Sequence, residues 1–385
     1  MRRMGAIFAA HLAEISVYLY QQPTWPAFIW QPERLEPLLG AVRHQQGRVL
    51  GHMEALGFSL QAEALLQTLT LEALKSSEIE GELLPSEQVR SSLARRLGLD
   101  VAGLVPAERR VEGVVDMLLD ATQGFAQPLT AERLCSWQAA LFPTGRSGLQ
   151  RIQVGAWRTG VKGPMQVVSG PPGREQVHFE APPAEEVTAQ MAQFLTWFNT
   201  NLPLDAVLKA GIAHLWFVTI HPFEDGNGRV ARALTELQLA RADASAQRFY
   251  SLSAQMRLER NAYYAQLEAA QKGNLDITTW LAWFLACLSR ALRATEHTLA
   301  KVLTKARFWE QHAAVALNAR QQRLLNQLLD GFEGNLTSSK WATIAKCSQD
   351  TATRDIQALL DYGILVKEAA GGRSTSYRLA DGASR

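Results

Sequence analysis

The stretch HPFEDGNGRVAR, from His221 to Arg232, decides how this sequence is interpreted, because no apolar core needs its mixture of residues. It combines a histidine, two carboxylates, a Gly-Asn-Gly turn and two arginines within twelve residues. Gly226 and Gly228 let backbone N–H groups converge, and the helix expected to begin near Arg229 adds the positive end of its dipole. Such a turn before a helix is suited to binding phosphate.

The charged side chains around this turn fit a phosphate site. Arg229 and Arg232 are spaced i, i+3, so they share one helix face, and guanidinium groups match phosphate oxygens. Asp225 would repel phosphates unless a cation intervened, and Mg²⁺ bound through one carboxylate and phosphate oxygens is the natural candidate. His221 lies where it could deprotonate an incoming hydroxyl. Singly, these residues would indicate a structural histidine, an ordinary turn and a solvated face; their coincidence favours a phosphate site.

This stretch resembles the Fic signature, His-Pro-Phe-x-Asp/Glu-Gly-Asn-Gly-Arg-x-x-Arg, at every fixed position. The resemblance extends from about residue 18 to residue 303. It implies a helical core that transfers AMP from ATP to a Tyr, Thr or Ser hydroxyl of a target protein. By motif position, His221 resembles the general base that deprotonates this hydroxyl, and Asp225 resembles the Mg²⁺ ligand.

The same resemblance assigns the other motif residues to the nucleotide. Gly226, Asn227 and Gly228 resemble the anion hole for the α- and β-phosphates of ATP. Arg229 and Arg232 resemble the phosphate-binding arginines, with Arg232 reaching toward the γ-phosphate. These roles fit phosphoryl transfer, in which positioning and charge neutralisation dominate and no covalent enzyme intermediate is required.

The segment SSEIEGE, residues 76–82, has two interpretations. By itself it indicates a helix that stops at Gly81 and carries surface acids. Beside the Fic signature, Ser76, Glu80 and Gly81 resemble the family's inhibitory motif, Ser/Thr-x-x-x-Glu-Gly/Asn. That resemblance implies that the Glu80 carboxylate bonds Arg232, excludes the γ-phosphate and leaves ATP in an unproductive pose, as in the N-terminally inhibited class.

Further contacts are expected on the target and adenine sides of the site. A hairpin predicted between Met165 and Pro183 resembles the Fic flap, whose exposed strand edge can pair with the target backbone; an ordinary loop excursion is the alternative. Tyr263 and Tyr264 stand where the family carries a Tyr-Tyr pair near the nucleotide, and Gln271 could contact the base or ribose. For Tyr263, burial within an amphipathic helix is the alternative.

The pattern along the chain predicts a mostly α fold with a small β-hairpin flap and a C-terminal winged helix-turn-helix. Most segments repeat apolar residues at helical spacing. The stretch from 145 to 183 is rich in Gly and Pro, with short β-like runs around a Pro-Pro-Gly turn. The expected parts are an N-terminal extension (1–17), a helical domain carrying the inhibitory helix (18–110), a Fic core (111–303), a linker helix (304–317) and a winged-helix domain (318–385).

The C-terminal module has the order helix-helix-helix-hairpin, with two strands around Gly371-Gly372. In a winged helix, the helix within residues 349–363 would enter the DNA major groove and present Thr351, Thr353 and Arg354. From residue 318 onward the sequence contains nine Lys or Arg and seven Asp or Glu residues, which is a weak basic excess for a DNA-binding domain. Winged helices also serve in protein interaction and dimerisation, so DNA, a protein partner and a homodimer all stay open.

Composition excludes several broad classes. The 385 residues suit two or three domains, and a net charge of +2 indicates no bulk attraction to nucleic acid or membranes. Cys135, Cys287 and Cys347 lack metal-ligand spacing, so we expect buried thiols in a reducing compartment. The most apolar window, residues 280–288, is far shorter than the roughly 20 residues of a membrane span. No secretory signal is expected at the start, so a cytoplasmic location is predicted.

Two function classes follow. The first is an autoinhibited protein adenylyltransferase, with ATP as co-substrate and Mg²⁺ as cofactor, that modifies a target protein and itself. The second is a DNA-binding regulator that uses the Fic core as a nucleotide sensor; the intact His221 favours the enzyme, because a sensor needs no base. Within the enzymes, transfer of another phosphate-linked group is a further alternative.

Overall fold

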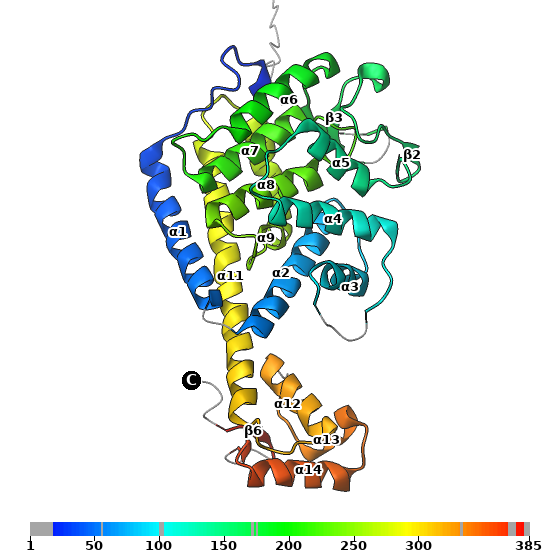
Figure 1. Cartoon of the computed structure of the whole chain (residues 1–385), viewed down its shortest axis with the longest axis vertical. Coiled ribbons are helices and arrows are strands. Elements are labelled where there is room, and N and C mark those ends of the chain that lie inside the picture. The colour runs from blue at the N-terminus through cyan, green and yellow to red at the C-terminus, as the bar shows by residue number, and fades with distance from the viewer. Residues whose placement is uncertain are drawn as a thin grey trace, which may run out of the picture. The chain divides into compact units, whose positions relative to one another are not determined.

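The structure is a computed structural model that describes residues 18–54, 57–99, 104–170, 173–174, 176–331, 334–368 and 375–380. The expected N-terminal extension, the Pro-Pro pair of the flap turn and the Gly-Gly turn of the wing lie outside these residues. The chain divides into two compact units at Arg293/Ala294. As the periodicity predicts, the fold is mostly helical (Figure 1).

The first unit is built almost entirely from helices, with two small hairpins. Its helices are η1 (Leu19–Gln21), α1 (Pro32–Glu54), α2 (Phe58–Ile79), α3 (Ser86–Arg96), α4 (Arg109–Gln123), α5 (Ala131–Leu141), η2 (Gly160–Lys162), α6 (Ala184–Asn199), α7 (Ala206–Ile220), α8 (Asn227–Asp243), α9 (Leu252–Leu258), α10 (Arg260–Gln271) and the first part of α11 (Thr278–Gln311). Its strands are β1 (Arg146–Ser147), β2 (Gln150–Arg151), β3 (Gln166–Ser169) and β4 (Gln176–Glu180).

Helix α7 is the centre of this unit. It is apolar on all sides, and every residue from Val207 to Ile220 is buried, as expected of a helix surrounded by protein. It packs along α8, and Figure 1 shows the two helices together in the middle of the unit. The Trp280 indole of α11 donates to the Gly211 carbonyl at 2.8 Å, which brings a second helix against α7. The candidate site lies where α7 ends and α8 begins.

The flap hairpin forms where the sequence predicts it. Strands β3 and β4 pair antiparallel with Gln166 opposite Glu180, and the register shifts between Val167 and Val168. Phe179 is buried, and its ring meets the Tyr18 ring edge-on at 5.2 Å, which anchors the hairpin to the start of the described chain. The second hairpin, β1–β2, falls within residues expected to be loop, because two-residue strands leave no alternating pattern to detect.

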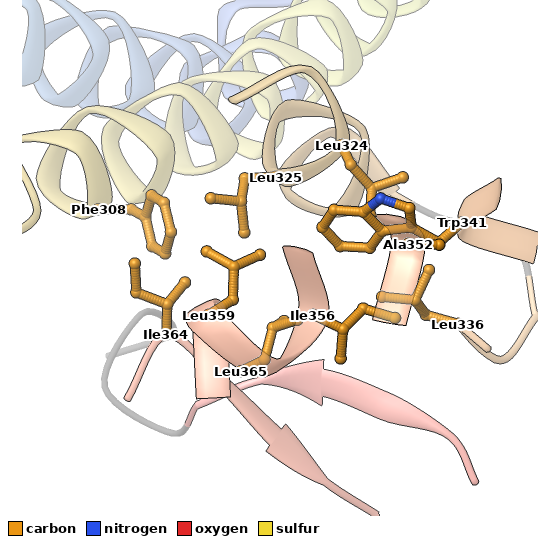
Figure 2. Close-up of a cluster of buried hydrophobic side chains, with 10 residues drawn as sticks. All are labelled: Phe308, Leu324, Leu325, Leu336, Trp341, Ala352, Ile356, Leu359, Ile364 and Leu365. Carbon is orange, nitrogen blue, oxygen red and sulfur yellow. The ribbon is translucent and has the colours of Figure 1, made fainter. Parts of the chain in front are cut away.

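The second unit has the expected order of three helices followed by a hairpin. These are α12 (Ala319–Gly331), α13 (Ser338–Ala345), α14 (Gln349–Asp361), and the antiparallel strands β5 (Leu365–Lys367) and β6 (Tyr377–Leu379). They enclose the hydrophobic cluster drawn in Figure 2, to which α11 contributes Phe308. The remaining members are Leu324, Leu325, Leu336, Trp341, Ala352, Ile356, Leu359, Ile364 and Leu365.

One expected boundary differs from the structure. The sequence suggested a Fic core that ends at residue 303 and a linker helix over 304–317. Instead α11 runs without interruption from Thr278 to Gln311, because this segment contains no glycine or proline that would end a helix. Among the described residues, no helix combines the length and apolar content that crossing a bilayer requires.

Candidate active site

The loop between α7 and α8 has a backbone that few sequences could adopt. His221 ends α7 in the left-handed region, with φ 51° and ψ 57°, and Gly226 precedes α8 with φ 89°. A Cβ at Gly226 would lie 2.9 Å from the Phe142 ring, so glycine is required there for space as well as conformation. The Asn227 side chain bonds both the N–H and the C=O of Phe223, at 2.9 and 2.8 Å. The predicted anion-hole asparagine therefore uses its side chain to hold the loop.

His221 has the ring orientation and the neutral charge state that a general base needs. Its Nδ1 lies 3.2 Å from the Val218 carbonyl, so Nδ1–H donates there and Nε2 keeps its lone pair. Burial lowers the pKa of His221 to about 4, and the positive charge of Arg158 acts in the same direction. The carboxylates of Glu80 and Asp225 oppose this shift without reversing it. The imidazole is therefore neutral near pH 7.

The structure brings Ser76 and Glu80 to the buried Arg232, although 150 or more residues separate them along the chain. Glu80 Oε1 lies 2.8 Å from Arg232 Nη2, while the Ser76 hydroxyl and carbonyl accept from Arg232 Nε and Nη2 at 2.9 and 2.7 Å. Burial would raise the pKa of Glu80, but the Arg232 guanidinium, with smaller contributions from Arg229 and His221, holds it below its usual range. Glu80 is therefore ionised at neutral pH.

The Glu80 carboxylate lies in the anion cradle itself. A Cβ built on Gly228 would be 2.0 Å from Glu80 Oε1 and 3.2 Å from Arg232 Nη1. The carboxylate thus rests against the first turn of α8, where the N–H groups have no intrahelical acceptors and the helix dipole favours an anion. An anion bound at the same turn would have to displace it.

Two buried donors beside the cradle fit a larger anion. Arg232 Nη1 and Arg229 Nε have no hydrogen-bond acceptor among the described residues. Buried guanidinium atoms without acceptors are costly, so an incoming group with several oxygens would be favoured here. The chemistry of this donor set fits the phosphates of a nucleotide.

The end of α2 explains why a glycine follows Glu80. Gly81 has φ 84°, its N–H donates to Glu78 O at 3.0 Å, and Glu82 N–H donates to Ser77 O at 3.1 Å. These two bonds form a Schellman motif, which ends a helix sharply at a left-handed residue. Arg260 Nε adds a bond to Ile79 O at 2.8 Å. The helix stop expected at Gly81 is therefore confirmed.

Glu82, which the sequence did not single out, engages the other motif arginine. Its Oε2 lies 2.6 Å from Arg229 Nη1, and the Arg229 guanidinium lies 4.9 Å from the centre of the Phe142 ring. Both arginines of the motif are thus paired with carboxylates from the SSEIEGE segment. The only signal in the sequence was a second acid two residues after Glu80.

The two carboxylates of the motif have different surroundings. Glu224 is ion-paired with Lys162 and accepts the Gln153 N–H at 3.1 Å. Among the described residues, the donors to the Asp225 carboxylate are neutral: the Ser147 hydroxyl and the Gly226 N–H. Asp225 is therefore the carboxylate whose charge is left for a cation. The described residues contain no cluster of three or more metal-binding side chains, so a cation here would complete its shell with phosphate oxygens and water.

The three residues predicted to contact adenine or ribose lie on α10 in different environments. The Tyr264 hydroxyl lies 3.4 Å from Glu80 Oε2. Tyr263 is buried, its hydroxyl is 2.8 Å from His214 Nε2, and its ring stacks on Trp283 at 5.8 Å. Gln271 is also buried. The contacts of Tyr263 match the packing alternative, and the nucleotide roles of all three stay predictions.

The flap presents strand edges and partly exposed apolar side chains. Among the described strands β3 pairs only with β4, so each has one edge without a partner strand. Val168 and Val177 are 48% and 41% exposed, although both lie in the hairpin. Arg158, which the sequence did not identify, joins this region to His221 through backbone carbonyls.

Comparisons with known proteins agree with this geometry. Residues 128–239 match the family model described as "Fic/DOC family". Residues 18–99 match a second model, "Domain of unknown function (DUF4172)". The segment matched by the first model contains the flap, the α7–α8 loop and both motif arginines, whereas Glu80 lies in the segment matched by the second model.

Curated relatives match the chain over part of their length. "Protein adenylyltransferase fic-1" of Caenorhabditis briggsae is 38% identical over 93 residues, which cover 24% of this chain and 17% of that protein. "Protein adenylyltransferase Fic" of Nematostella vectensis is 34% identical over 116 residues, covering 29% and 25%. The chain thus spans a quarter or less of the length of these relatives.

A solved structure shows the fold. A Fic family protein from Desulfovibrio desulfuricans G20 superimposes with a TM-score of 0.54 and 22% identity, and the match covers 92% of this chain and 98% of that one. The predicted mostly helical fold with a flap hairpin is therefore confirmed.

Proposed function

We propose that this protein is an autoinhibited protein adenylyltransferase, which transfers AMP from ATP to a Tyr, Thr or Ser hydroxyl of a target protein and of itself. The observation that carries the proposal is the Glu80 carboxylate lying against Gly228 and bound to Arg232. A carboxylate at that position indicates that the site accepts anions, and it also prevents another anion from binding there. The neutral His221 beside it is a group that a passive anion sensor would not need.

The proposed chemistry uses His221 as the base. Its Nε2 takes the proton of the target hydroxyl, the hydroxyl oxygen bonds to the α-phosphorus, and the bond from that phosphorus to the β-phosphate oxygen breaks. Pyrophosphate leaves, and the proton remains on the imidazole until solvent removes it. The first turn of α8, Arg229 and Arg232 would neutralise charge on the phosphates. Mg²⁺ held by Asp225 and phosphate oxygens would add to this neutralisation.

Autoinhibition follows from competition for one guanidinium. Arg232 is buried and already bonds Ser76 and Glu80, so a γ-phosphate can bond it fully only after Glu80 leaves. Because the pKa of Glu80 is held below its usual range, protonation does not release it near pH 7. We propose that a partner or a conformational change of α2 does so.

The test is intact-mass analysis of self-modification with ATP and Mg²⁺. Glu80→Gly should gain AMP, while wild type gains little and Glu80→Gly with His221→Ala gains none. Glu78→Gly is the matched control: Glu78 lies two residues earlier and pairs with Lys75 and Arg257 rather than with the motif arginines. A folded Glu80→Gly protein that binds ATP but gains no mass would refute the proposal. A different added mass would identify transfer of another phosphate-linked group.

The alternative is a DNA-binding regulator that uses the Fic/DOC domain to sense a nucleotide. It is favoured by the second unit, in which Thr353 and Arg354 are exposed on α14, the helix that would enter the major groove of DNA. Asp350 and Asp361 are exposed on the same helix and weaken this proposal. ATP-dependent DNA binding in a protein whose Glu80→Gly variant adds no group would favour it.

A further inference from the structure

Arg158 is a buried arginine whose partners are all backbone carbonyls. Its side chain is 5% exposed and forms no ion pair with a carboxylate among the described residues. Nε donates to His221 O at 2.7 Å, and Nη2 donates to Pro182 O at 2.5 Å and Ile220 O at 3.3 Å. The Arg158 backbone N–H donates to Pro222 O at 2.8 Å. One residue therefore holds three consecutive residues of the catalytic loop.

The Ile220 and His221 carbonyls are favourable acceptors for a cationic side chain. Ile220 and His221 are at the C-terminal end of α7, where carbonyls lack intrahelical donors and the helix dipole is negative. The His221 backbone is also in the left-handed region. A residue other than glycine keeps this conformation only when its surroundings enforce it. The planar guanidinium can serve both carbonyls together, which a lysine ammonium does less well.

The same guanidinium reaches the flap. Pro182 follows β4 by two residues, so its carbonyl marks the point where the chain leaves the hairpin. Through Arg158, the backbone of His221 and the base of the flap share one rigid partner.

We propose that Arg158 is a positioning residue for the proposed AMP transfer: it holds the backbone of His221 at the end of α7 and fixes its distance to the flap on which the target docks. The inference rests on the proposed function. Its consequence is that Arg158 aligns base and acceptor hydroxyl without touching either substrate.

The electrostatics of the site provide a readout that a purely structural role would not affect. The charged and titratable groups that face His221 are Arg158, Glu80 and Asp225. Arg158 opposes protonation of the imidazole, whereas the two carboxylates favour it. Removing the Arg158 charge should therefore raise the pKa of His221 and move the acid limb of the activity profile to higher pH.

Arg241 is a matched control. It too is partly buried and donates to two backbone carbonyls, Phe125 O at 2.8 Å and Gln127 O at 2.9 Å. Its guanidinium lies 4.9 Å from the centre of the Phe198 ring. Burial lowers the pKa of Arg241 as it lowers that of Arg158, yet the Arg241 hydrogen bonds go to carbonyls just after α4 instead of to His221.

The experiment compares Arg158→Gln, Arg158→Lys and Arg241→Gln in the full chain carrying Glu80→Gly. Arg158→Gln should lower kcat for AMP incorporation on the order of 100-fold, with little change in KM for ATP, because a small misplacement of the base has effects of that size. Its acid limb should move to higher pH. Arg158→Lys keeps the charge and should recover part of kcat and the original acid limb. Arg241→Gln should lower the Tm but leave kcat and the acid limb unchanged.

The outcomes separate the inference from the proposed function. If the Glu80→Gly parent adds no AMP, the proposed function fails and the inference fails with it. If the parent is active, a folded Arg158→Gln protein with unchanged kcat and acid limb overturns the inference alone. Equal losses of kcat in Arg158→Gln and Arg241→Gln would also overturn it. Should Arg158→Gln not fold, Arg158→Lys decides: a reduced kcat at unchanged KM supports the inference, and an unchanged kcat overturns it.

Discussion

The two sides of the candidate active site are held in different ways. On the side proposed to inhibit, the end of α2 is bound to α8 by ion pairs to two buried arginines, Glu80 to Arg232 and Glu82 to Arg229. On the side proposed to bind the target, the base of the flap is tied to Arg158 through the Pro182 carbonyl, and the flap itself forms a partly exposed pair between His178 and Glu268 at 2.9 Å. The first side is held by buried ion pairs, whereas the second presents strand edges that have no partner strand among the described residues.

Under the proposed function, this difference follows from what each side would accept. A buried guanidinium needs a counter-charge or, as at Arg158, several backbone carbonyls, because an unsatisfied buried charge is costly; Arg229 and Arg232 have carboxylates. The protein's own carboxylates supply that charge, and in the proposed mechanism phosphate oxygens replace them. The flap needs no such substitute, because a strand edge near the surface can bond water before the proposed target strand pairs with it. Three changes would break or sharpen this contrast.

The largest effect is expected from Gly228→Ala. The new Cβ would lie 2.0 Å from Glu80 Oε1, so the carboxylate must swing away and lose Arg232. We expect the free energy of unfolding to fall by about 3 kcal/mol, at the upper end of overpacking effects.

The coupling between Gly228→Ala and Glu80→Gly is measured by urea unfolding. The measurement compares wild type, the two single variants and the double variant. The substitution should be markedly less destabilising when Glu80 is absent, with a coupling of about 1 to 3 kcal/mol. Equal effects in both backgrounds would show that the carboxylate does not occupy the cradle in solution.

A smaller, pH-dependent effect is expected from Glu80→Gln. The pKa of Glu80 is lowered in the folded protein from its ordinary value of 4.5, so its ionisation stabilises the fold above that value. That contribution is lost as pH falls through the lower folded pKa. Since the Glu80 side chain is 33% exposed, we expect Glu80→Gln to lower the free energy of unfolding by only about 1 kcal/mol at pH 7.

Unfolding measured from pH 7 down to pH 3 tests this sign. The difference in the free energy of unfolding between wild type and Glu80→Gln should shrink below pH 4.5. Glu78→Gln is not a suitable control here, because the pKa of Glu78 is also lowered. A difference that grew with acidity would contradict the assigned ion pair.

The smallest effect is expected from His178→Ala on the flap. His178 Nδ1 contacts Glu268 of α10 and its Nε2 lies 2.6 Å from the Ser169 hydroxyl, but the pair is partly exposed. Its loss should lower the free energy of unfolding by less than about 1 kcal/mol. Amide hydrogen exchange in β4 should nevertheless become faster, while exchange in α2 stays unchanged. Faster exchange at the end of α2 would show that the two sides are not independent.

Much of the site could be predicted because its parts are local in sequence. The turn at Gly226–Gly228, the two arginines on one helix face and the helix stop at Gly81 follow from chain geometry within a few residues. The hairpin between Met165 and Pro183 is likewise local, since its strands are joined by a short turn. Short elements escaped this reasoning, as the two-residue strands β1 and β2 show.

The missed residues all act across long separations. Glu82 reaches Arg229 over 147 positions, Ser147 reaches Asp225 over 78, and Arg158 reaches His221 over 63. Each is a common residue type in an unremarkable local context. Periodicity and spacing contain no information about which distant segment will pack against it.

The sequence by itself determined that this protein has a helical core, a flap and a phosphate-type turn with a histidine before it, because backbone conformation and helix periodicity depend on neighbouring residues. Tertiary structure decided which charges meet. Packing α2 across the start of α8 puts Glu80 in the cradle and pairs Glu82 with Arg229. Among the described residues, Lys162 of η2 pairs with Glu224 and leaves Asp225 without a basic partner. Charge pairing depends on distance in space, and only the folded chain sets that distance.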